Sequence, residues 1–173
     1  MNLLQLAPLW LVALLAALLI AAAIQDVRHL RISNLIVAGV VFTAVLAAVL
    51  AGANIALWEN LVVFALVLAV GTLLFATGKV GGGDVKLFAA VGLWTDLHQA
   101  LWLTAAIFVA GGFLAVVMIA SRMLGLRSSR ASSQSKGGVP YAVAIAAGAL
   151  LVVGWARQAP APTGANPLQF PAR

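Results

Sequence analysis

Long apolar stretches alternate with short polar connections along almost the whole chain. Six stretches can be separated, at approximately 3–24, 35–57, 60–77, 84–97, 99–121 and 139–155. A helix needs about 20 apolar residues to cross the roughly 30 Å hydrocarbon core of a bilayer, and its backbone polar groups must be bonded internally. The pattern therefore predicts an all-α, polytopic membrane protein with about six transmembrane helices.

Composition supports this prediction, because 64% of the 173 residues are hydrophobic and 8% are charged. A water-soluble domain of this length could not bury so much apolar surface. The last segment, 157–173, is rich in proline and alanine, which is typical of a flexible tail. We therefore expect one six-helix membrane domain over residues 1–156, followed by that tail.

The positive charges predict the orientation, because Lys and Arg collect in cytoplasmic loops. With the N-terminus outside, the loops at 25–34, 78–83 and 122–138 are cytoplasmic. These loops and their borders hold eight of the ten positive residues: Arg28, Arg31, Lys79, Lys86, Arg122, Arg127, Arg130 and Lys136. No Lys or Arg precedes the first apolar stretch, so we expect it to remain as a span and not to be removed as a secretory signal.

Tryptophans and two of the four acidic residues fit the opposite, outer side. Glu59 and Asp96 fall in the predicted outer loops. Indole rings prefer the membrane interface. Four tryptophans are accordingly expected at the outer interface: Trp58, Trp94, Trp102 and Trp155.

The other two acids, Asp26 and Asp84, lie at the cytoplasmic ends of the first and fourth stretches. Each has a simple structural explanation: Asp84 follows a glycine run and could cap a helix, and Asp26 could pair with Arg28 or Arg31. An ionisable group at membrane depth is costly, however, and usually faces a partner or a cavity. We therefore expect Asp26 and Asp84 to face each other.

The fourth stretch is short, since residues 84–94 would form only about 16 Å of helix. The preceding glycines are then expected to enter the membrane. Irregular backbone is tolerated there only where it is buried in protein or lines a water-filled cavity. The sequence thus predicts a water-filled pocket at Asp84.

Several other kinds of function are disfavoured. The net charge of +6 comes from dispersed residues without interleaved aromatics, so nucleic acid is not an expected partner, whereas membrane lipids are. The absence of cysteine excludes a thiol nucleophile and thiolate metal sites. His29 and His98 have no partner histidine at ligand spacing, so we expect neither a metal nor another cofactor.

Two carboxylates in one pocket suit aspartyl proteolysis. Close like charges share one proton, so the ionised member can activate a water while its protonated partner polarises the scissile carbonyl. Gly81, Gly82 and Gly83 would let a substrate backbone approach closely, because they carry no side chain.

Three segments resemble a known family. GGGDVKLF, residues 81–88, resembles the GxGD motif of the prepilin and preflagellin peptidases, which are intramembrane aspartyl proteases. QDVRHLRISN, residues 25–34, is similar to the family's first-aspartate segment, with Ser33 in place of a proline. VPYAVAIAAG, residues 139–148, resembles the start of its last helix. The resemblance implies that Asp26 and Asp84 are the catalytic pair, with supporting roles for Asn34, Lys86, Pro140 and Tyr141.

The resemblance also implies a substrate class. Prepilins would be cut at the cytoplasmic face of the cell membrane, after a short basic leader and ahead of a hydrophobic helix. Larger family members add an N-methyltransferase activity and often a cysteine-rich zinc-binding insertion, for which this chain has neither room nor cysteines. It therefore resembles the small, peptidase-only type that accompanies Flp (tight-adherence) pili. A small ion- or proton-coupled transporter and a noncatalytic pilus or secretion assembly subunit remain as alternatives.

Overall fold

The computed structural model describes residues 2–52, 57–78, 80–124 and 141–158, and the regular structure in these ranges is helical throughout. The helices are α1 (Leu3–Leu6), α2 (Leu9–His29), α3 (Asn34–Leu50), α4 (Leu57–Ala76), α5 (Gly82–Gly92), α6 (Leu97–Met123) and α7 (Tyr141–Gln158). Four of them, α2, α4, α6 and α7, are long and apolar enough to cross a membrane, and α3 is a shorter apolar helix of 17 residues. The prediction of an all-α, polytopic membrane protein is confirmed, whereas the number of spans and the orientation stay predictions.

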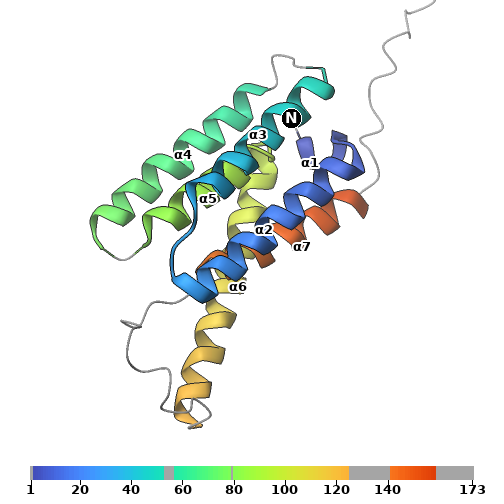
Figure 1. The fold of residues 1–173 in the computed structure, drawn as a ribbon. Helices are drawn as coiled ribbons and strands as arrows, with labels where there is room; N and C mark the ends of the chain where they lie inside the picture. Colours follow the sequence, from blue (N-terminus) through green and yellow to red (C-terminus); the bar gives the residue numbers. More distant parts are fainter. Residues whose placement is uncertain (1, 53–56, 79, 125–140, 159–173) are drawn as a thin grey trace, which may run out of the picture.

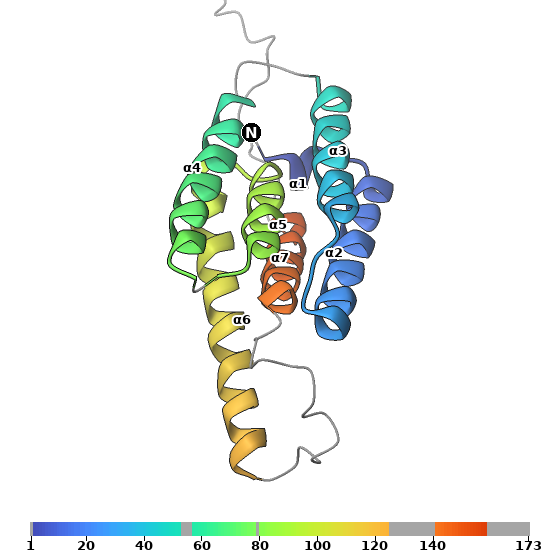
Figure 2. The same cartoon turned by 60° about the vertical axis from the view of Figure 1, so that its left-hand side comes forward.

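The short helix α5 lies inside the bundle. It packs against α3, α4 and α7, and Figure 2 shows it between these longer helices. The helix has 11 residues, and Leu87, Ala89 and Ala90 in its middle are fully buried. The predicted stretch of 84–97 differs from this helix at both ends, since α5 begins two residues earlier, at Gly82, and ends at Gly92. Because neighbouring helices and not lipid surround α5, about 16 Å of helix is enough to carry Asp84 into the bundle.

The first apolar stretch is two helices, not one. Pro8 separates α1 from α2, as expected for a residue without a backbone N–H. The short α1 packs on the end of α7, where Gln5 Nε2 donates to the Ala156 carbonyl at 3.0 Å and Arg157 Nη2 donates to the Ala7 carbonyl at 2.6 Å. Helix α7 thus continues through Gln158, two residues into the predicted tail, and 159–173 lies outside the described residues.

Trp94 is enclosed by the bundle and is not exposed on its surface, in contrast to what the sequence suggested for an interfacial tryptophan. It is fully buried, and its indole Nε1 donates to the Val40 carbonyl of α3 at 3.4 Å. The reason is its position directly after α5, the helix enclosed by the bundle. Trp58, Trp102 and Trp155 are exposed, and the last two stack edge to face at 5.3 Å.

The helices α6 and α7 are in very close contact at Gly148. A Cβ atom on Gly148 would lie 2.7 Å from the backbone nitrogen of Ile107 and 2.8 Å from its Cα. Small residues allow helix backbones to approach in this way, and van der Waals packing is the main attraction between helices in lipid. Helix α6 continues beyond its partners at one end of the bundle (Figure 1).

We predict that Gly148→Ala destabilises the protein by about 1–3 kcal/mol, because the added methyl group forces the two backbones apart. The measurement is the midpoint of thermal unfolding in detergent. Gly154→Ala on the same helix is the control, because nothing lies within 4 Å of its Cβ position. Equal midpoints for the two variants would contradict the close approach of α6 and α7.

Candidate active site

Asp26 lies in the last turns of α2 and is only 5% exposed. Its Oδ2 accepts a hydrogen bond from the backbone N–H of Ala142 at 2.9 Å. Ala142 is the second residue of α7, and the N–H groups of a first helical turn have no acceptor within the helix and carry partial positive charge. The N-terminus of α7 therefore holds this carboxylate. Neither Arg28 nor Arg31 forms an ion pair with Asp26 in the part of the chain that the structure describes.

Asp84 is the third residue of α5, and Gly81 occupies the N-cap position. The Asp84 carboxylate accepts a hydrogen bond from the backbone N–H of Gly81. An acidic side chain that reaches back to the N-cap N–H forms one half of a capping box. The simple N-cap interpretation of Asp84 was therefore wrong by position, although the side chain does stabilise the start of this helix.

The three glycines before Asp84 each face a neighbour within this chain. A Cβ on Gly81 would lie 2.7 Å from Asp84 Oδ2, and one on Gly83 would lie 3.2 Å from the Cβ of Ile32. Gly82 faces the ring of Phe75 at 3.3 Å. Gly82 and Gly83 are helical, so the irregular stretch expected here is short. The close approach of a substrate backbone to these glycines stays a prediction.

The carboxylates of Asp26 and Asp84 are near enough to interact electrostatically. They come from α2 and α5, which make almost no direct contact within the described residues. Both helices pack instead against α3 and α7. The structure thus brings the two acids together at one end of the bundle, where α2 ends and where α5 and α7 begin (Figure 2).

Two supporting residues predicted from the sequence also meet. Lys86 Nζ donates to Asn34 Oδ1 at 3.4 Å, which links α5 to the first residue of α3. Tyr141 is the first residue of α7, and its ring lies 3.7 Å from the Cβ position of Gly111 on α6. Pro140 lies outside the described residues.

Sequence reasoning missed Gln25, the residue before Asp26. Its side-chain Oε1 accepts a hydrogen bond from the backbone N–H of Ser33 at 2.7 Å. Ser33 in turn caps α3, because its Oγ accepts from the N–H of Leu35 at 3.2 Å. The signal available in the sequence was Ser33 itself, since proline at this position would have no N–H to donate.

A cavity of about 300 Å³ lies beside Asp84, between α4, α5, α6 and α7. Its polar side chains are those of Asp84, Thr104 and Tyr141, and the rest of the lining is apolar. Asp26 does not line it. The sequence predicts a water-filled pocket at Asp84. The structure has a pocket there, but its mostly apolar walls suit an apolar group that reaches Asp84 from one side.

Residues 13–120, which include both Asp26 and Asp84, match the model of the Type IV leader peptidase family. The chain belongs to this family. No curated protein and no solved structure matches the chain. Membership confirms the resemblance found in the sequence, and it makes the chain a membrane-bound protease of the aspartic type whose substrates are pilin precursors.

We predict that Asp26→Ala lowers the free energy of unfolding by about 1–3 kcal/mol, because the N–H of Ala142 is left buried without an acceptor. Asp26→Asn keeps a side-chain oxygen at the same place, so its stability should stay close to that of the wild type. Thermal unfolding in detergent gives the comparison. If Asp26→Ala were as stable as Asp26→Asn, the hydrogen bond to α7 would have no structural role.

Proposed function

We propose that this protein is an aspartyl endopeptidase that removes the short basic leader of Flp-like type IV prepilins, with Asp26 and Asp84 as the catalytic pair. The observation that carries the proposal is the proximity of the two carboxylates, which α2 and α5 bring to one end of the bundle. Both residues fall within the segment that matches the leader peptidase family. Membership in this family supports the protease over the transporter.

The proposed chemistry uses one proton shared between the two acids. The ionised carboxylate takes a proton from a water molecule, and the resulting hydroxide attacks the scissile carbonyl carbon. The protonated carboxyl donates a hydrogen bond to the carbonyl oxygen, which stabilises the negative charge that develops there. When the tetrahedral intermediate collapses, the C–N bond breaks and the leaving amine receives a proton from the pair.

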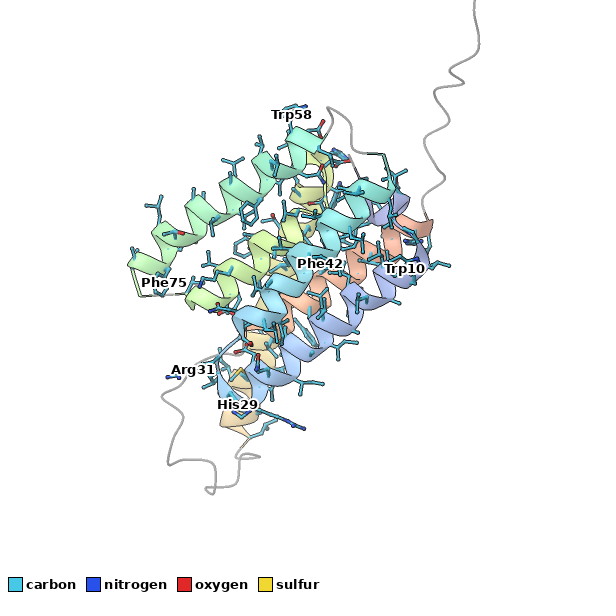
Figure 3. The ribbon with its side chains drawn as sticks, turned by 45° about the horizontal axis from the view of Figure 1, so that its top comes forward. Trp10, His29, Arg31, Phe42, Trp58 and Phe75 are labelled. Atoms are coloured by element: carbon cyan, nitrogen blue, oxygen red, sulfur yellow. The ribbon has the colours of Figure 1, made fainter. Side chains whose placement is uncertain are left out.

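We place the acid pair at the cytoplasmic face of the cell membrane. His29 and Arg31 lie at the end of the bundle where α2 ends, whereas Trp58 lies at the opposite end (Figure 3). Arg28 and Arg31 are exposed there. Positive residues favour the cytoplasmic side and tryptophans favour an interface. This orientation agrees with an N-terminus outside.

The cavity beside Asp84 is the proposed binding site for the apolar segment of the prepilin that follows the bond. Its apolar walls match such a segment, and Asp84 lies in the same wall. A volume of about 300 Å³ admits one or two large apolar side chains and not a whole helix. The basic leader would then lie outside the bundle, on the cytoplasmic side.

We predict that Asp26→Asn and Asp84→Asn each abolish leader removal, because either amide leaves the pair without one acid. The measurement is co-expression with a candidate Flp-type prepilin, followed by gel mobility of the pilin. Asp96→Asn is the matched control. Asp96 caps α6, where its Oδ1 accepts from the N–H of Gln99 at 2.8 Å, and it lies outside the proposed site.

Normal processing by either Asn variant would overturn the proposed catalytic pair. An uncut pilin with every variant and with the wild type would favour the transporter or the assembly subunit. Aspartate-dependent ion flux would separate those two alternatives, since an assembly subunit would show none.

We predict that Val67→Phe, which fills the cavity from α4, lowers kcat/KM for the natural prepilin roughly tenfold or more. A prepilin with alanine in place of the large apolar residue nearest the bond should recover part of this loss in the variant. Leu73→Phe is the control, because Leu73 is on the same helix, is 70% exposed and does not line the cavity. Equal kcat/KM values for Val67→Phe and the wild type would exclude the cavity as the substrate site.

A further inference from the structure

The separation of Asp26 and Asp84 is not fixed by contact between their own helices. Within the described residues, α2 and α5 make almost no direct contact. The hydrogen bond from Ala142 holds Asp26, but it does not reach Asp84. Some other part of the chain must therefore set the position of α5 relative to the end of α2.

Besides α3 and α7, residues 30–34, which run from the end of α2 to the first residue of α3, touch both sides; we call this segment the strap. On the α2 side, Leu30 turns the chain back, with a left-handed backbone at φ 52°. A left-handed conformation is costly for leucine, so the surrounding structure must hold it. The hydrogen bond from the Ser33 N–H to Gln25 Oε1, at 2.7 Å, supplies such a constraint.

On the α5 side, the strap lies against the residue next to the second acid. The Cβ position of Gly83 is 3.2 Å from the Cβ of Ile32 and 3.5 Å from its backbone nitrogen. Because Gly83 carries no Cβ, Ile32 can lie this close to α5, and the strap packs on the residue directly before Asp84. Asn34, at the end of the strap, also accepts the hydrogen bond from Lys86 at 3.4 Å.

We propose that Gln25 is a positioning residue: by binding the Ser33 N–H it holds the strap against α5, and it thereby sets the distance between Asp26 and Asp84. Gln25 lies on α2 directly before Asp26. The strap that it holds packs, through Ile32, on Gly83, the residue directly before Asp84. This side-chain hydrogen bond thus adds to the coupling that the two helices already have through their shared packing on α3 and α7. The consequence for catalysis rests on the proposed function, whereas the coupling itself does not.

The catalytic test uses Gln25→Met, which keeps the length of the side chain and removes the acceptor oxygen. We expect kcat for a prepilin to fall roughly 10- to 100-fold, as for a small misplacement of catalytic groups, while KM changes by less than about twofold. The unfolding midpoint should stay close to that of the wild type. A rise in KM at unchanged kcat would overturn the positioning role.

Ser33 supplies the matched pair of variants. Ser33→Pro removes the N–H, and the φ of −67° at this position suits proline. Ser33→Ala keeps the N–H and loses only the cap to Leu35. We expect Ser33→Pro to lower kcat well below the value for Ser33→Ala, and to add little in the Gln25→Met background. Fully additive effects would show that Gln25 does not act through Ser33.

A cross-linking test measures the coupling without catalysis. The natural chain has no cysteine, so Ile32→Cys with Gly83→Cys creates one thiol pair, whose Cβ separation of 3.2 Å is slightly below the roughly 3.5–4.5 Å of a disulfide. Under a mild oxidant, we expect this pair to cross-link several-fold faster with Gln25 than with Gln25→Met. Equal rates would overturn the proposal even if the protein is a peptidase. A slower rate with Gln25→Met would support the coupling even if no prepilin is cut.

Discussion

The hydrogen bond between the Asp26 carboxylate and the N-terminus of α7 is the constraint on which the rest of the site depends. It joins residues 116 positions apart, so it closes the bundle as well as fixing an acid. Helix α7 then packs along α2, α5 and α6. A shift of α7 would therefore move three things at the same time: Asp26, the surface of α7 on which α5 packs, and one wall of the cavity. This explains why α7 is built from small residues: alanine and glycine let three helices approach one backbone closely.

The second acid is held by a different and more local device. Asp84 binds the N–H of its own N-cap residue, Gly81, and the absence of a Cβ on Gly81 leaves room for the carboxylate. One acid is thus fixed by a distant helix and the other by its own first turn. Two carboxylates that are held by different parts of the chain keep a constant separation only if the helices that carry them are rigidly coupled. In this chain, α3, α7 and the strap have to provide that rigidity, because α2 and α5 hardly touch.

The sequence predicted the fold class and the meeting of the two acids, because both follow from the free-energy cost of leaving polar groups without partners in a membrane. Apolar stretches must become helices in lipid, and buried acids need partners. The details that failed depend on contacts between distant segments. Trp94 follows a helix whose enclosure could not be read from its own residues, and the position of α5 depends on α3, α4 and α7. The first apolar stretch ends at residue 24, yet α2 continues to His29, because Asp26 and Gln25 accept hydrogen bonds from the N–H groups of Ala142 and Ser33.

The apolar cavity has a consequence for hydrolysis under the proposed function. A peptidase in a membrane must bring one water molecule to the bond and keep lipid away from the acids. Asp84 is in the cavity wall and Asp26 is not, so an apolar side chain in the cavity would cover only one side of the pair. Under the proposed function, water and the basic leader would approach the pair from the other side, toward the end of α2. Substrate binding would then exclude water from the side of the apolar segment. The lower local dielectric constant would strengthen the electrostatic interaction between the acids and the scissile carbonyl. Under the proposed function, the same geometry would favour substrates with an apolar residue after the bond, because a polar one would lose its hydration without gaining a partner in the wall.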